Sequence, residues 1–332
     1  MYPLLLASLA LTALIVVFSS ALYVRRLRSL RRRRDAGAAL RLVEPIAIDL
    51  LDGDTPGEVA AEHEAALAES LSRLAPIVTG ETRDLIGRHF ESTGAVERAC
   101  RRLADPCAHV RAATAAQLGD MCSNRAELPL LQALNDADRD VRLAAARSLG
   151  RLRAAANPLL VSLVRRAVPG AVATGALLSI GAAALPGVRA LLHHAHPRAR
   201  ADAVELLGLL GNPADSLLLQ QRLDDDVAAV RSRACQALTR LGALDAKDAV
   251  EVALADPDQR VRMAAAEALG QLGDRDSSVR LIHVAQTDLP DVARMAAEAL
   301  VRVAPGLAGR TAAGSNASPQ LRRAAATAGD DG

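Results

Sequence analysis

The chain has 332 residues and a formal net charge of +2. Trp is absent and the aromatic residues are two Tyr and two Phe, which argues against a large globular core built on aromatic rings. Seven of the 40 basic residues lie between Arg25 and Arg34. The rest of the chain has 33 basic and 38 acidic residues. Its net charge is therefore −5, which argues against nucleic-acid binding.

The first apolar segment predicts a membrane anchor. Residues 4–24 carry no charge, and a helix of this length spans about 30 Å, the thickness of the hydrocarbon core of a bilayer. No Lys or Arg precedes this segment, so the positive-inside rule places the N-terminus outside and the rest of the chain in the cytoplasm. A cleaved signal peptide is the alternative, but it requires a basic start and a shorter apolar run. We therefore expect residues 1–24 to form the transmembrane helix of a single-pass protein of the plasma membrane.

A basic juxtamembrane segment and linker is predicted over residues 25–59. Basic side chains beside an anionic leaflet are attracted to its headgroups, and each contributes about 1 kcal/mol. We expect lipid contacts at Arg25, Arg26, Arg28, Arg31, Arg32, Arg33 and Arg34. The Gly and Pro residues scattered between positions 37 and 57 are typical of a linker.

Residues 60–93 predict a helical cap. Leu67, Leu71 and Leu74 share one face of a first helix, and a second short helix follows from Glu81. Both helices lack the signature of the repeats that follow them. Atypical helices of this kind are typical of the end of a solenoid, where they cover the apolar face of the first full repeat.

A sequence repeat occupies residues 94–304, and each copy ends in a second helix rich in Ala and Leu. The first core residue of that helix, called position 0 below, recurs at intervals of 31, 31, 27, 31, 31 and 31 residues, at Val110, Val141, Val172, Ala199, Val230, Val261 and Val292. Positions 0, 4, 8 and 11 lie within about 80° on a helical wheel, so they predict a buried stripe. A fixed period of this length is typical of stacked supersecondary units. We predict an all-α protein, an α-solenoid of about seven helical hairpins, with a disordered tail rich in Ala, Gly and Ser over residues 305–332.

One copy of the repeat contains Asp256-Pro257-Asp258, Val261-Arg262, Ala264 to Ala266 and Leu269-Gly270-Gln271-Leu272-Gly273. Through these residues the repeat resembles the HEAT family in its short bacterial form, which is related to phycobilin-lyase repeats. In that family the repeated Asp and Arg form a ladder between neighbouring repeats. The resemblance implies structural ladder arginines at position 1, namely Arg111, Arg142, Arg200, Arg231 and Arg262, with Ala173 and Ala293 in place of two others.

We predict no catalytic residue, no metal site and no cofactor. Deoxyhypusine hydroxylase resembles this fold and binds two irons through repeated His-Glu pairs, and the chain has a single such pair, His63-Glu64. The cluster of His193, His194 and His196 is compatible with a metal or pH-sensing site, but a solvated turn is the simpler interpretation because the nearest carboxylate is Asp202. The four cysteines match no zinc spacing and indicate buried thiols.

The outward face of the second helices is the candidate partner surface. Positions 2, 6 and 10 point away from the buried stripe, and their residues differ from repeat to repeat. We predict partner contacts at Leu143, Arg147, Thr174, Leu178, Glu205 and Leu209. Residues 167–188 carry no charge, which indicates a partner groove, extra core packing or a second transmembrane span; the continuing repeat argues against the span.

Together these patterns predict a membrane-anchored scaffold or adaptor, not an enzyme. We expect it to bind a membrane-associated protein at the cytoplasmic face of the membrane, to contact anionic lipid and to bind no nucleic acid. Two alternatives stay open: a HEAT-like repeat enzyme of the lyase type, and an accessory subunit of a membrane envelope enzyme such as a glycosyltransferase.

Overall fold

The computed structural model describes residues 43–51, 64–154, 156–273 and 275–330. These residues contain no strand, and their helices follow one another as successive hairpins, which confirms the predicted all-α solenoid. The chain divides into two compact units, residues 1–133 and residues 134–332. The predicted transmembrane helix and the predicted lipid-contacting arginines lie outside the described residues.

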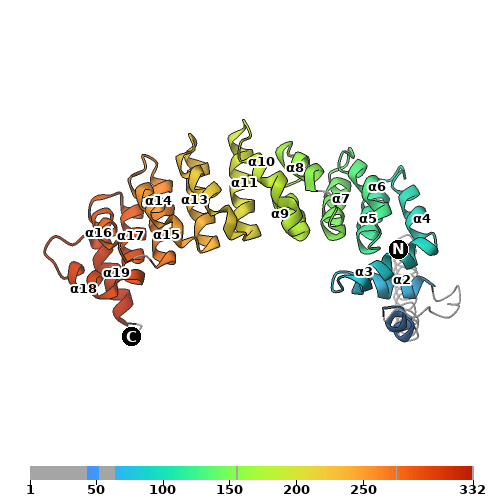
Figure 1. Cartoon of the computed structure of the whole chain (residues 1–332), viewed down its shortest axis with the longest axis horizontal. Helices are drawn as coiled ribbons and strands as arrows, with labels where there is room; N and C mark the ends of the chain where they lie inside the picture. Colours follow the sequence, from blue (N-terminus) through green and yellow to red (C-terminus); the bar gives the residue numbers. More distant parts are fainter. Residues whose placement is uncertain (1–42, 52–63, 155, 274, 331–332) are drawn as a thin grey trace, which may run out of the picture. The chain divides into compact units, whose positions relative to one another are not determined.

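The first unit contains the predicted cap and the first repeat (Figure 1). Its helices are α2 (Glu64–Leu74), α3 (Glu81–Ser92), α4 (Ala95–Arg102), α5 (Ala108–Asp120), η1 (Asn124–Ala126) and α6 (Glu127–Ala133). Leu67 and Leu71 are buried as the cap prediction requires, whereas Leu74 is half-buried. An added Cβ on Gly87 of α3 would lie 2.8 Å from the carbonyl oxygen of Cys122, so the two backbones touch there.

Residues 43–51, which we predicted as part of a linker, are helical instead. Val43, Ala47 and Leu50 recur at helical spacing, and all three are buried. Pro45 is the only Gly or Pro among these nine residues. The apolar periodicity of this segment therefore decides its helical structure, in spite of the helix-breaking Gly and Pro residues in the predicted linker.

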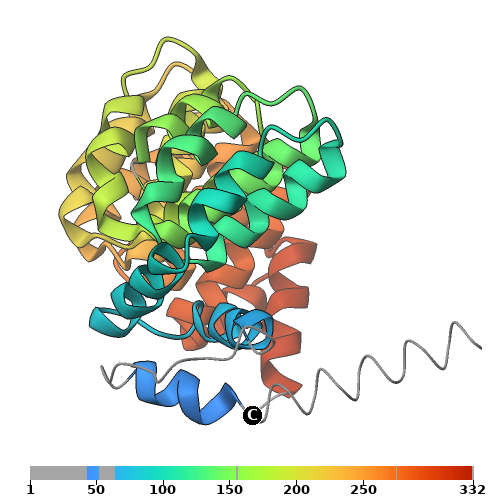
Figure 2. The same ribbon diagram turned by 90° about the vertical axis from the view of Figure 1, so that its right-hand side faces the viewer.

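The second unit contains the remaining repeats. Its helices are α7 (Arg139–Leu152), α8 (Ala156–Val164), α9 (Gly170–Ile180), η2 (Gly181–Ala184), α10 (Leu185–Leu191), α11 (Pro197–Leu210), η3 (Pro213–Asp215), α12 (Ser216–Gln220), η4 (Gln221–Asp224), α13 (Ala228–Leu241), η5 (Leu244–Ala246), α14 (Lys247–Val252), η6 (Ala253–Ala255), α15 (Gln259–Leu272), α16 (Ser278–Thr287), α17 (Pro290–Val303), α18 (Pro305–Ala312) and α19 (Pro319–Asp330). Within this unit α9, α11, α13 and α15 follow one another in chain order (Figure 1), and the second view shows its green to orange helices one behind another (Figure 2).

Every predicted second helix begins two residues before its position 0, from Ala108 in α5 to Pro290 in α17. Most of the stripe is buried as predicted. Val261, Ala265 and Leu269 in α15 are completely buried and Leu272 is 9% exposed, whereas Val110 in α5 and Val172 in α9 are only half-buried. The turn before the helix supplies the cap, because the side chain of Asp258 accepts the amide hydrogen of Arg260.

The predicted disordered tail is wrong, because residues 305–330 form a further hairpin of α18 and α19. Leu321 lies two residues after the start of α19 and is completely buried, so it occupies position 0 of one more repeat. Ser318 Oγ accepts the Leu321 amide at 3.2 Å and donates to the Ala285 carbonyl oxygen at 2.6 Å. Leu321-Arg322 follows Val292 by 29 residues. The repeat signal was present there, but the Ala-, Gly- and Ser-rich composition concealed it.

Candidate partner-binding surface

The second helices of the second unit pack closely through small residues. An added Cβ on Gly208 of α11 would lie 2.8 Å from the Cα of Ala237 in α13, and one on Gly270 of α15 would lie 2.9 Å from the Cα of Ala299 in α17. At these crossings the glycines face only alanines, whose Cβ atoms would lie 2.7 and 2.9 Å from the added Cβ. The outward residues at positions 2, 6 and 10 of the second helices α7, α9, α11, α13, α15 and α17 are here called the second-helix surface. At the crossings of α11 with α13 and of α15 with α17 these residues lie on closely spaced helices.

An Arg–Asp ladder connects successive hairpins. Arg231 Nε and Nη2 donate to the two carboxylate oxygens of Asp256 at 2.7 and 2.8 Å, and Arg231 Nη1 donates to the Asp225 carbonyl oxygen at 2.8 Å. Each arginine thus binds the turn before its own helix and the aspartate of the next hairpin. The bidentate geometry recurs in the pairs Arg200–Asp225 and Arg262–Asp288.

The ladder aspartates are charged at neutral pH although they are largely buried. Burial tends to raise the pKa of Asp225, but hydrogen bonds from Arg200 and from the Val227 amide outweigh it and lower this pKa to about 2. For Asp288 the bond from Arg262 is the largest influence, and the pKa is again lowered. The ion pairs therefore persist over the physiological pH range.

The other two predicted ladder arginines bind backbone carbonyl groups. Arg142 Nε donates to the Ala167 carbonyl oxygen at 2.7 Å, because Ala167 stands where other turns have an aspartate. Arg111 Nη1 donates to the Asp105 carbonyl oxygen at 2.9 Å, within the turn that precedes its own helix.

The ladder is interrupted between α9 and α11. Ala173 stands in place of the arginine, and His194 occupies the position of the aspartate in the facing turn. His194 Nδ1 accepts the His196 amide at 3.0 Å, and His196 Nδ1 accepts the Arg198 amide at 3.2 Å. His196 therefore caps α11, and His194 holds the turn before it, where other turns use aspartate.

The 27-residue step shortens one second helix by about one turn. α9 has 11 residues, whereas α7 and α11 have 14. Gly150 of α7 faces Ala176 at position 4 of α9, whereas Ala237 and Ala299 make the equivalent contacts from position 7. The packing register is therefore shifted by three residues between α7 and α9, one junction before the 27-residue step.

Within the described residues, Gly170–Leu191 is apolar and long enough to span a membrane. The segment comprises α9, η2 and α10, and the chain bends at Gly181, which has a φ of 73°. Ala173, Ala176 and Leu177 are buried within the hairpins. These features favour the core-packing interpretation of the uncharged stretch.

Two adjoining hollows lie on the second-helix surface. The larger, of about 610 Å³, lies where α11, α13 and α15 begin, and Arg198, Arg233 and Arg260 surround Ala201 and Val227. Two of these arginines already have partners, since Arg233 lies 3.3 Å from Asp202 and Arg260 lies 3.3 Å from Asp258.

The smaller hollow, of about 190 Å³, continues the first along α13 and α15. Its outward residues include Gln236, Arg240, Glu267 and Gln271, which occupy positions 6 and 10 of their helices. Gln236 lines both hollows, so together they form one feature, here called the α11–α15 groove. Its polar and charged side chains differ between the two helices, although the buried positions beneath them are alike.

The predicted contact residues lie on α7, α9 and α11, and none of them lines this groove. Arg147 is exposed and Leu209 is 41% exposed, whereas Leu143, Thr174, Leu178 and Glu205 are partly buried. The carboxylate of Glu205 lies 3.7 Å from Arg233, which connects it to the edge of the larger hollow. The hollow part of the surface thus begins at α11, where the prediction ended.

A second series of polar contacts, which the sequence analysis missed, connects the first helices. Arg189 Nε donates to Asp215 Oδ1 at 2.7 Å, and Ser216 Oγ donates to Asp245 at 2.9 Å. The separations of 26 and 29 residues are close to the repeat period. That spacing was the available signal, but the residue types change from hairpin to hairpin.

The cysteine prediction is correct in part. Cys122 and Cys235 are buried, but Cys107 is exposed and Cys100 is half-buried. Burial and the nearby Asp256 charge raise the pKa of Cys235 to about 12. Among the described residues, no group of three or more His, Cys, Asp or Glu side chains is placed to hold a metal ion.

Comparisons with known proteins agree with the repeat architecture. A family model described as HEAT repeats matches residues 96–181 and 216–301, which together exceed half of the chain. No curated protein matches the chain.

Three solved structures are similar to the chain. They are the CpcE–CpcF complex of phycocyanin lyase from Nostoc sp. PCC7120 (22% identity, 71% of this chain, 94% of that chain, TM-score 0.30), human deoxyhypusine hydroxylase in complex with glycerol (20%, 81%, 98%, 0.33) and an engineered protein (17%, 86%, 77%, 0.37). These TM-scores are too low to support an inference about activity.

Proposed function

This chain belongs to the HEAT-repeat family, and on that premise we propose that it is a scaffold that holds a protein partner on its second-helix surface, at the cytoplasmic face of the membrane. The observation that carries the proposal is the α11–α15 groove. Side chains that vary between repeats surround a hollow there, above a repeated core of Val, Ala and Leu. A repeated scaffold acquires specificity in this way.

The membrane part of the proposal rests on the sequence of residues 4–34. An uncharged stretch of spanning length precedes seven arginines, and the positive-inside rule then assigns the repeats to the cytoplasm. Tethering the repeats beside the bilayer raises their effective concentration towards partners in the same membrane. The proposed partner is therefore a membrane-associated protein.

Site-specific photo-crosslinking in native membranes tests the choice of surface. A crosslinking residue is placed at Gln236 or Gln271 in the groove and, as the matched control, at Val279, which is 74% exposed on the first helix α16. We expect both groove positions to capture the same protein and Val279 not to capture it. Capture of that protein at Val279 alone would contradict the proposed surface.

A reporter fusion tests the membrane topology separately. A reporter fused after residue 60 is expected to be active only when it is of the kind that functions in the cytoplasm. If a reporter that functions only after export is active at the same point, the chain has the opposite orientation, whatever the crosslinking result.

A further inference from the structure

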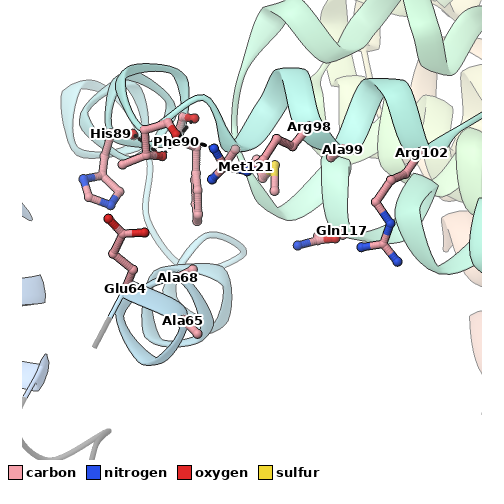
Figure 3. Close-up of a pocket in the computed structure, with 12 residues that line it drawn as sticks. Glu64, Ala65, Ala68, His89, Phe90, Arg98, Ala99, Arg102, Gln117 and Met121 are labelled. Carbon is pink, nitrogen blue, oxygen red and sulfur yellow. Dashed lines mark hydrogen bonds between the residues drawn. The ribbon is translucent and has the colours of Figure 1, made fainter. Parts of the chain in front are cut away.

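A cavity in the first unit lies apart from the second-helix surface. It has a volume of about 400 Å³ and is bounded by α2, α3, α4 and α5 (Figure 3). Small side chains create the space, because Ala65 and Ala68 on α2 and Ala95 and Ala99 on α4 line it where larger residues would fill it. Cavities of this size hold small ligands. We call it the cap pocket.

The cap pocket has a basic wall. Arg98 and Arg102 lie one turn apart on α4, and both are exposed. Arg98 Nη1 donates to the Thr93 carbonyl oxygen at 2.8 Å. Among the described residues no carboxylate is paired with either guanidinium. The nearby Glu97 is engaged elsewhere, since it accepts from Arg125 Nη1 at 2.7 Å.

The opposite wall carries a single acid. Glu64 on α2 lies beside His89 on α3 (Figure 3). Burial lowers the pKa of His89, against the opposite influence of the Glu64 charge, so the imidazole is neutral at neutral pH. Two arginines therefore face one carboxylate across the cavity, and the pocket has a net positive charge.

The floor of the cap pocket is apolar. Phe90 and Met121 lie beneath the cavity, and Phe90 is the one Phe, Tyr or Trp among the described residues. A ligand that fits this pocket therefore needs an anionic group for the arginines and an apolar body for the alanines and Phe90.

We propose that the cap pocket binds a phosphate monoester with a small apolar body, its phosphate held between Arg98 and Arg102 and its apolar part against Ala65, Ala68 and Phe90. Arg98 and Arg102 stand one turn apart on α4 and together carry the two positive charges that match the double charge of a phosphate monoester, to which arginine donates paired hydrogen bonds. A soluble metabolite and the headgroup of a lipid such as phosphatidic acid share this chemistry. The proposal is independent of the partner surface.

Phenyl phosphate is the probe, titrated calorimetrically into the full chain reconstituted in phosphatidylcholine vesicles. We expect it to bind at least about tenfold more tightly than inorganic phosphate or benzyl alcohol, because each of these has half of the recognised features. The double variant Arg98→Gln, Arg102→Gln is expected to lose about tenfold or more in affinity. The matched control is Arg101→Gln, because Arg101 is exposed on the same helix but does not line the cavity.

A second variant separates binding from folding. Ala68→Leu keeps both arginines and fills the cavity, so it is expected to weaken phenyl phosphate and to leave inorganic phosphate unchanged. The proposal would be overturned if the double variant and Arg101→Gln bound phenyl phosphate equally well. It would also be overturned if the wild type bound phenyl phosphate and inorganic phosphate with equal affinity. Vesicles containing phosphatidic acid distinguish the sources: competition with phenyl phosphate indicates the lipid headgroup, and its absence indicates a soluble ligand.

Discussion

Replacing Arg231 with alanine tests whether the ladder stabilises the junction between hairpins. The change removes two hydrogen bonds to Asp256, at 2.7 and 2.8 Å, and one to the Asp225 carbonyl oxygen. The side chains of this ion pair are 14% and 9% exposed, so water restores little of what is lost. Removing one partner of a buried pair costs about 3–5 kcal/mol. The Asp258 amide still donates to Asp256 at 2.8 Å, which lowers our expectation to about 2–3 kcal/mol.

Local hydrogen exchange is the appropriate assay, because a repeat array opens in parts and its global unfolding free energy is poorly defined. We expect the protected amides of α13 and α15 to exchange roughly 30 to 150 times faster in Arg231→Ala than in the wild type. The double variant Arg231→Ala, Asp256→Ala should cost less than the sum of the two single variants, because each single variant leaves an unpaired partner.

The matched control is Arg294→Ala on α17. Arg294 pairs with Glu298 at 2.7 Å, but the two side chains are 51% and 36% exposed. Such an exposed helical pair contributes about 0.3–0.5 kcal/mol. If Arg231→Ala increases exchange no more than Arg294→Ala does, the ladder is not a source of stability and our reasoning is refuted.

Four further predictions follow from the packing and the titrating groups. Gly270→Ala should destabilise the α15–α17 contact by about 1–3 kcal/mol, because its Cβ would meet the Ala299 backbone at 2.9 Å. Gly175→Ala meets nothing within 4 Å and should stabilise α9 by about 0.5–1 kcal/mol. Hydrogen exchange of the amides of α15 and α17, and of α9, measures the two effects. The ladder aspartates have a lower pKa in the folded chain than in the unfolded one, so their stabilising contribution is complete above about pH 3.8 and should be lost as the pH falls towards about 2, as circular dichroism would show. A thiol reagent should label the exposed Cys107 in the native chain, whereas the buried Cys235, with its raised pKa, should react only after unfolding; mass spectrometry of labelled peptides distinguishes them. Deleting residues 305–332 should accelerate hydrogen exchange in α17, because α18 and α19 pack against it, and unchanged exchange would favour the original interpretation of a disordered tail.

The repeat predicted the fold well because each hairpin depends mainly on its own residues and on its nearest neighbours. Val141 and its equivalents located the start of each second helix, and the stripe of positions 0, 4, 8 and 11 is buried in α7 and α15. The prediction of a disordered tail over residues 305–332 was wrong because it relied on composition. Ala and Gly are common in disordered segments and equally common where helices pack closely, so composition alone could not separate the two cases, whereas the spacing of Leu321 from Val292 could.

The surface was harder to predict. Position along a helix indicates whether a side chain points outward, and this placed Arg147 and Leu209 correctly at exposed sites. Whether outward residues surround a hollow depends on the distance and tilt between neighbouring helices, which no single repeat encodes. The cap pocket has the same origin, because α2 and α3 of the cap meet α4 and α5 of the first repeat there, and no periodicity relates the cap to the repeats.

The interruption at Ala173 and His194 makes the second unit mechanically uneven. The pairs Arg200–Asp225, Arg231–Asp256 and Arg262–Asp288 act as consecutive clamps, so α11 to α17 respond to force as one stiff segment. Between the α8–α9 hairpin and α11 the described chain has only a longer ion pair, in which the half-exposed Arg166 lies 3.3 Å from Asp202, and two histidine rings hold only their own turn. The junction between α9 and α11 is therefore held less tightly than the junctions from α11 to α17, so the second unit is expected to bend there more readily.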